Sequence, residues 1–324
     1  MPVRLAGCFR AGLGAGLRMS LWLVALMTPI SLGVKLLDWL GWLAIIGRPL
    51  EPVFRLVGLP GRCVVPFVTG ACINLYSGIA AIGSIELTGR QMTILALMML
   101  ISHNLPIEMA VQRKTGTPSW RTLLLRLTTS FAGAAALNLL MPAPAADAAV
   151  VRVGDAAAGA VEFWPMLAGW AVGMLYLAGK VFAIVIGLMI LQRLLREFGL
   201  IPLLGKLFYP LLWLLGLPRR CAFLWIVANT LGLAYGAGVI VEEVSRHDIT
   251  PRDAQLLNRS IAVCHSLLED TLLFAAIGAW VLWITLPRLV IAAGVVWTYR
   301  IITSKKRSQL PVVSSQQEKL KAEN

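Results

Sequence analysis

Three long apolar blocks limit the folds open to this chain: Leu21–Ile46, Gly173–Leu191 and Leu272–Trp297. Each is near or above the ~20 residues that a helix needs to cross a ~30 Å hydrocarbon layer. Only 14% of the 324 residues are charged and 58% are hydrophobic, whereas soluble domains carry about 25% charged residues. The sequence therefore predicts an all-α, polytopic membrane protein whose surroundings are a lipid bilayer.

The formal net charge of +13 comes from basic residues that crowd the ends of the chain and a few loops. This placement fits membrane topology and attraction to anionic headgroups. A nucleic-acid-binding face would carry aromatic residues among those charges, and we expect no nucleic-acid partner. The five cysteines form no CxxC pair and no metal-finger spacing, so neither a disulfide framework nor a cofactor is predicted.

An internal duplication organises the chain. Gly58–Cys63 (GLPGRC) recurs as Gly216–Cys221 (GLPRRC). Further matches keep the same order: Leu32–Lys35 with Leu177–Lys180, Leu75–Gly78 with Leu233–Gly236, and Ser102–Leu105 plus Glu108 with Cys264–Leu267 plus Asp270. We predict a first repeat over 1–141, an extracytoplasmic linker over 142–162, a second repeat over 163–303 and a disordered cytoplasmic tail over 304–324.

Each repeat is predicted to contain the same five segments. They are a leading helix (19–46; 164–195), an amphipathic segment (48–60; 199–218), an apolar stretch broken by small and polar residues (64–84; 222–241), a helix with a His motif (90–112; 253–278) and a closing helix (120–141; 281–302). If the broken stretch enters and returns as a re-entrant hairpin, each repeat crosses three times and the second is inverted.

The positive-inside rule favours that hairpin. With the N-terminus inside, the basic loops lie in the cytoplasm and the acidic linker lies outside, whereas a crossing stretch would move two basic groups outside. The basic groups are Arg113/Lys114/Arg121, Arg193/Arg196/Lys206/Arg219/Arg220 and Arg246/Arg252/Arg259. Both termini are then expected in the cytoplasm, at the cytoplasmic (inner) membrane of a bacterium.

Broken, re-entrant backbone at membrane depth is tolerated where it is buried in protein or lines a wet cavity. Paired hairpins in inverted repeats are how many secondary transporters hold a solute. The candidate substrate-binding residues are Asn74, Ser77, Asn104, Asn229, Thr230, Tyr235 and Ser266. The alternative is that these small and polar residues satisfy one another and allow close helix packing.

Ionisable residues inside apolar helices form a second set. Burying a charge in a bilayer costs about 2.5–3.5 kcal/mol even on insertion scales, so such residues tend to pair or to mark a pathway. The candidates for ion coupling or a relay are His103, Glu108, His265, Glu269, Asp270, Lys35 and Lys180. Lysine–carboxylate pairs that join two helices are the structural alternative. No spacing demands a metal site, and none is assigned.

The stretch Ser102–Glu108 (SHNLPIE), followed by Val111–Gly116 (VQRKTG), resembles the signature of gate-domain, or nucleoside recognition, membrane proteins. These include the spore maturation proteins A and B, and the domain is similar to parts of concentrative nucleoside transporters and to the gates of ferrous iron transport protein B. The resemblance covers about 20–140 and 164–300, which implies two fused gate domains. The chain has no GxxxxGK[ST] loop, so we do not expect nucleotide-driven iron transport by this chain alone.

Two functions follow from the resemblance. The first is a transporter or permease for a nucleoside-like or other small polar solute, with the histidines as a route to proton coupling. The second is a non-transporting scaffold or regulatory subunit of the spore-maturation type. No HExxH, GxSxG or paired-aspartate motif is present, so no enzyme activity and no catalytic residue are predicted. Homo-oligomerisation stays open.

Overall fold

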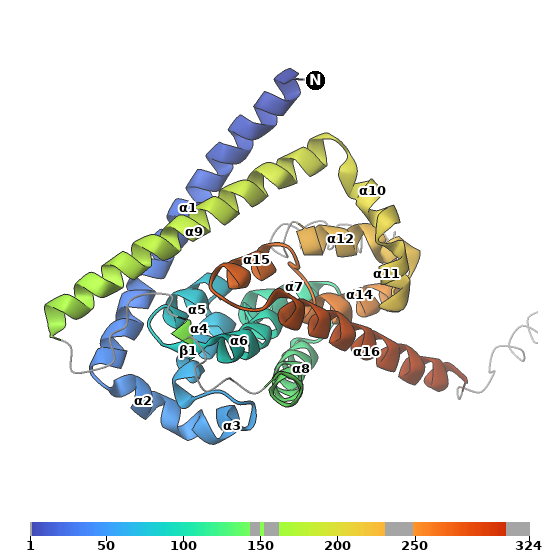
Figure 1. Ribbon diagram of the computed structural model, residues 1–324. Coiled ribbons are helices and arrows are strands. Elements are labelled where there is room, and N and C mark those ends of the chain that lie inside the picture. The colour runs from blue at the N-terminus through green and yellow to red at the C-terminus, as the bar shows by residue number, and fades with distance from the viewer. Residues whose placement is uncertain (1, 143–149, 152–161, 231–248, 309–324) are drawn as a thin grey trace, which may run out of the picture.

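The computed structural model describes residues 2–142, 150–151, 162–230 and 249–308, and it confirms an all-α membrane protein (Figure 1). The first half comprises α1 (Pro2–Trp39), α2 (Trp42–Gly47), α3 (Glu51–Leu56), α4 (Val64–Cys72), α5 (Leu75–Ile82), β1 (Leu87–Thr88), α6 (Gly89–Ser102), α7 (Leu105–Lys114) and α8 (Ser119–Leu140). The second comprises β2 (Val150–Val151), α9 (Phe163–Glu197), α10 (Leu200–Leu207), α11 (Tyr209–Leu214), α12 (Ala222–Thr230), α14 (Pro251–Val263), α15 (Glu269–Ala276) and α16 (Val281–Ser308). Short 3₁₀ turns cover Arg48–Leu50, Gly61–Cys63 and Arg219–Cys221.

Within these ranges, five segments are long and apolar enough to cross a membrane. They are Arg4–Trp39, Gly89–Lys114, Ser119–Leu140, Phe163–Glu197 and Val281–Ser304. A sixth would be the pair Ile45–Leu56 and Gly61–Cys72, which is bent by 105°. The predicted helices over 90–112 and 253–278 are each broken in two, the first into α6 and α7 and the second into α14 and α15. The inverted relationship of the two repeats stays a prediction.

The leading helices α1 and α9 lie side by side and run in opposite directions, forming the long arm at the upper left of Figure 1. Glycines make this contact close, because a Cβ at Gly12 or Gly16 would lie 2.7 Å from the Cα of Ile190 or Ile186. Small residues four apart allow helix backbones to approach in this way. Helix α1 begins at Pro2, well before the predicted start near residue 19, and this additional part contains both glycines.

The two repeats interleave in the rest of the molecule. Helix α6 is the central element, and every side chain from Met92 to Ser102 is buried. It packs against α8 of its own repeat and α16 of the other, while α14 packs against α6, α8 and α16. The buried centre of the molecule is therefore lined by both halves of the chain.

Matching local signals start the motif helix in each repeat. Thr88 and Gln91 form a reciprocal capping box at α6, and Thr250 and Asp253 form one at α14. Such a box satisfies two of the backbone N–H groups that a helix N-terminus leaves free. Strand β1, just before α6, pairs antiparallel with β2 from the predicted linker. The end of the first hairpin and that part of the linker therefore lie together.

Candidate functional site

Both motif helices end just before their histidine, and the residue after each histidine has left-handed backbone. Asn104 and Ser266 have φ values of 51° and 48°, in the left-handed region. Their backbone N–H groups donate to carbonyls of the broken stretches, Asn104 to Gly70 at 3.1 Å and Ser266 to Ala228 at 3.2 Å. The same two features recur in each repeat, so each break holds its motif helix against its own broken stretch.

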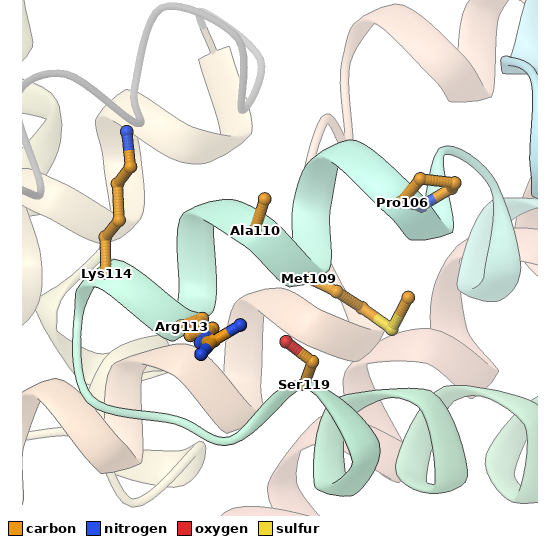
Figure 2. A pocket seen from close by; sticks show the side chains of 6 residues that line it. All are labelled: Pro106, Met109, Ala110, Arg113, Lys114 and Ser119. Atoms are coloured by element: carbon orange, nitrogen blue, oxygen red, sulfur yellow. The ribbon is translucent and has the colours of Figure 1, made fainter.

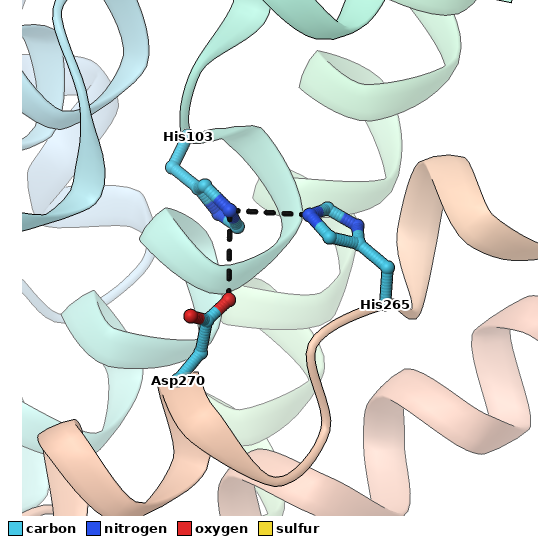
Figure 3. A group of neighbouring side chains, drawn as sticks. All are labelled: His103, His265 and Asp270. Carbon is cyan, nitrogen blue, oxygen red and sulfur yellow. Dashed lines mark hydrogen bonds and ion pairs between the residues drawn. The ribbon is translucent and has the colours of Figure 1, made fainter. Parts of the chain in front are cut away.

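The two breaks place the side chains of His103 and His265 next to one another. Their Nε2 atoms are 3.1 Å apart (Figure 3). The Nδ1 atoms lie 3.0 Å and 2.7 Å from the carbonyl oxygens of Met99 and Ile261, one helical turn earlier. Since a carbonyl only accepts, both Nδ1 atoms carry a hydrogen. When both rings are neutral, their Nε2 atoms therefore present lone pairs to each other.

Two buried carboxylates complete this arrangement. Glu108 Oε1 is 3.1 Å from His265 Nε2 and 3.4 Å from His103 Nε2. Asp270 Oδ2 is 3.5 Å from His103 Nε2. We call His103, His265, Glu108 and Asp270 the His–carboxylate cluster. Each repeat contributes one histidine and one acid, and all four side chains are buried.

A fully buried arginine, Arg126 of α8, supports the first break. Its Nη1 forms an ion pair with Glu108. Its Nε donates to the Ile101 carbonyl at 2.6 Å and its Nη2 to the His103 carbonyl at 2.8 Å. These are carbonyls at the C-terminal end of α6, which a helix leaves without intrahelical partners. Arg126 thus stabilises the break and orients Glu108 toward the histidines.

Arg288 of α16 holds the matching place in the second repeat, also fully buried. Its Nη2 donates to Thr271 Oγ1 at 2.6 Å, and its Nη1 lies 3.5 Å from the His265 carbonyl. Neither Arg126 nor Arg288 was predicted from the sequence as a site residue. A signal was present, because each lies in an apolar helix, 23 residues after its histidine.

Tyr76 of α5 was also missed as a site residue. Its hydroxyl donates to Glu269 Oε1 at 2.5 Å and so joins the first broken stretch to the second motif. Glu269 lies beside Asp270, and the centre contains three acids, Glu108, Glu269 and Asp270, and two arginines. If all three acids are ionised and both histidines are neutral, these groups carry one net negative charge.

Four of the predicted solute-binding residues, Asn74, Ser77, Asn229 and Thr230, lie on the broken stretches. Asn74 caps α5, where its Oδ1 accepts from Ser77 N at 2.8 Å and from Ser77 Oγ at 3.0 Å. Asn229 Nδ2 and Thr230 Oγ1 donate to carbonyls of their own helix. Tyr235 lies outside the described residues.

Three buried acceptor atoms in this region receive no hydrogen bond within the described part of the chain: Asn104 Oδ1, Asn229 Oδ1 and Asp270 Oδ2. Native proteins leave few such atoms, and each calls for an explanation. All three belong to residues singled out from the sequence. Their role in binding stays a prediction.

The two lysines of the leading helices make other contacts. Lys35 Nζ is 3.6 Å from Asp38 Oδ2 in the same helix. Lys180 Nζ donates to the carbonyl of Ala276, at the end of α15, at 2.6 Å and lies 4.4 Å from the ring centre of Tyr176. Lys180 thus joins α9 to the helix that carries Asp270, and a relay role for either lysine stays a prediction.

A surface pocket of about 540 Å³ follows the outer side of α7. Figure 2 shows Arg113 and Ser119 turned toward one another there, with Met109 beside them. Glu108, the neighbour of Met109 in the chain, is buried and belongs to the cluster. One helix therefore faces the buried centre on one side and a cationic pocket on the other.

These features define a membrane protein with a buried polar centre at broken helices. The family model described as Gate, nucleoside recognition, matches residues 20–113. An uncharacterized membrane protein of Bacillus subtilis (strain 168), YvoD, is 33% identical over 274 residues, which cover 83% of this chain and 86% of that protein. The chain therefore belongs to the Gate (nucleoside recognition) family of membrane proteins. No solved structure matches it.

Proposed function

We propose that this protein is a permease for a small polar solute, with nucleosides as the first class to test. One observation carries the proposal: two repeats each deliver a histidine, an acid and a broken helix to one buried centre. Broken helices that meet at a repeat interface are a recurring form of solute site in transporters. Membership of a nucleoside recognition family supports the solute class.

The unpaired acceptors support a solute that carries hydrogen-bond donors. Asn104 Oδ1, Asn229 Oδ1 and Asp270 Oδ2 are buried and receive no hydrogen bond from the residues that the structure describes. Leaving a buried acceptor unpaired costs about 1–3 kcal/mol. Nucleosides offer sugar hydroxyl and base N–H donors that would satisfy such atoms. The proposal assigns no catalytic residue.

We place the protein in the cytoplasmic membrane of a bacterium, with the repeats inverted and both termini inside. The placement of the basic loops and of the acidic linker supports this topology.

In this proposal a cation occupies the His–carboxylate cluster during the transport cycle, and the proton is the cation expected from the sequence. His103 Nε2 faces His265 Nε2, Glu108 and Asp270, with Arg126 behind Glu108. A proton on one Nε2 would be shared with the other ring or with Glu108. Coupling would then appear as uptake driven by an inward proton gradient.

Uptake by proteoliposomes tests the proposal. The purified chain would be reconstituted and assayed with labelled uridine, adenosine, nucleobases and organic acids, with and without a pH gradient. We expect uptake of one solute class above that of empty liposomes and its loss in Asn104→Gly. Glycine removes the amide but accepts the left-handed backbone. Ile107→Ala, an exposed position on the same helix, is the matched control and should transport normally.

The scaffold alternative rests on a different observation. Asn258 of α14 donates to Thr115 and Thr117 of the first repeat, each at 2.8 Å, and so joins the repeats through buried polar groups. In a scaffold, the polar groups of the buried centre would likewise serve to join the two repeats. It predicts no uptake of any solute by the folded wild-type protein, with cluster variants changed only in stability.

A further inference from the structure

We propose that the His–carboxylate cluster binds one divalent transition-metal ion. The ligands would be the Nε2 atoms of His103 and His265 and one carboxylate oxygen each from Asp270 and Glu108. The inference goes beyond the sequence analysis, which assigned no metal. It concerns binding alone, so it stands whether or not the chain moves a solute.

The first argument is the direction of the lone pairs. Both Nδ1 atoms are engaged by backbone carbonyls, so both neutral rings turn an acceptor inward. Glu108 Oε1 and Asp270 Oδ2 are acceptors as well. Four acceptors that converge repel one another unless a cation lies between them. A divalent ion would satisfy all four, whereas a single proton is shared by only two.

The distances between the proposed ligand atoms also fit a metal site. Ligand atoms 2.0–2.1 Å from a tetrahedral ion are separated from one another by ~3.3 Å. The measured separations are 3.1 Å for the two Nε2 atoms, 3.1 and 3.4 Å from Glu108 to the two rings, and 3.5 Å from Asp270 to His103. The ligand atoms of His103, His265 and Asp270 all lie within 4.8 Å of one another. Small side-chain shifts would therefore enclose an ion.

The third argument is the surroundings of the ligands. Metal-bound histidines usually donate their second ring N–H to a carbonyl or carboxylate, which fixes the ring. Here Met99 and Ile261 supply those carbonyls. Arg126 holds the other oxygen of Glu108, so Oε1 stays directed at the rings. The orientation of three ligands is thus set in advance.

Ligand type indicates the class of ion. Imidazole nitrogen with carboxylate oxygen suits Zn²⁺ and its first-row neighbours rather than Mg²⁺ or Ca²⁺, which prefer oxygen alone. Protons compete for the same lone pairs, so metal binding should weaken in acid.

Zinc binding by the detergent-purified chain tests the inference. The exposed thiol of Cys72 is removed by Cys72→Ser in all samples. After chelator treatment, Zn²⁺ is titrated by calorimetry, and the loaded protein is studied by X-ray absorption. We expect one Zn²⁺ per chain with nitrogen and oxygen neighbours at about 2.0–2.1 Å. No stoichiometric binding, or a sulfur neighbour at about 2.3 Å, would overturn the proposal.

Variants assign the ligands. His265→Gln and Asp270→Asn should each weaken Zn²⁺ binding at least 10-fold. Asp270 is chosen because its replacement leaves the Arg126–Glu108 pair intact. Glu51→Gln, which removes a surface carboxylate paired with Arg55, is the matched control and should bind as the wild type does. Unchanged binding in both cluster variants would contradict the assignment. If neither variant folds, the absorption spectrum of the wild type still decides.

Discussion

Replacing Arg126 by methionine should be among the most destabilising single changes in this chain. The substitution keeps an unbranched side chain but leaves Glu108 as a buried charge without its cation. Removing one member of a buried ion pair costs about 3–5 kcal/mol. The Ile101 and His103 carbonyls also lose donors at 2.6 and 2.8 Å, each worth about 1–3 kcal/mol. Because these costs overlap, we expect a loss of at least 4 kcal/mol in the free energy of unfolding.

Equilibrium unfolding in mixed micelles of dodecyl maltoside and dodecyl sulfate measures this loss. Adding Glu108→Gln to Arg126→Met removes the unpaired charge and should restore about 2 kcal/mol, within the range of coupling between contacting residues. Arg288→Met is the matched comparison. Among the described residues, the groups that accept hydrogen bonds from Arg288 are neutral. We therefore expect a smaller loss in the free energy of unfolding, about 2 kcal/mol. A loss below 1 kcal/mol for Arg126→Met, or strict additivity with Glu108→Gln, would refute the reasoning.

Three further changes test other parts of the structure. Gly16→Ala should destabilise the protein by about 1–3 kcal/mol, because its Cβ would collide with the backbone of α9. Gly33→Ala is the control, since the space around Gly33 is open, and it should not destabilise the protein. Thermal unfolding compares the two variants, and equal effects would count against this contact between α1 and α9. Asn104→Ala should be less stable than Asn104→Gly by about 1 kcal/mol, the cost of left-handed backbone, and the reverse order in the same assay would contradict the observed φ. Tyr76→Phe removes the hydrogen bond to Glu269 and should cost about 1.5–3 kcal/mol, so an unchanged unfolding midpoint would show that this contact contributes nothing.

The duplication made much of the site predictable from sequence. His103 with Glu108 and His265 with Asp270 occupy matching places in the repeats, and the structure brings all four together. An apolar helix with a histidine and an acid after it indicated buried polar groups. The sequence did not indicate that the two histidines would contact one another across the repeats.

Other features depend on contacts that no local pattern encodes. Pro106 follows the first break, but α14 and α15 are separated without an internal proline. The second break is instead held by the hydrogen bond from Ser266 to Ala228. Arg126 binds backbone carbonyls that are free because α6 ends there. Its role could therefore not be predicted before the end of α6 was known.

Ligand-dependent stability tests the central claim most directly, namely that the His–carboxylate cluster forms part of a solute site. The purified protein and His265→Gln would be unfolded thermally against nucleosides, nucleobases, organic acids and divalent metals. A ligand at about 100 times its dissociation constant stabilises the folded state by ~2.7 kcal/mol. We predict stabilisation of the wild type by one organic solute class, reduced in the variant. The absence of any shift from the organic solutes in folded wild type would contradict the claim and favour a scaffold.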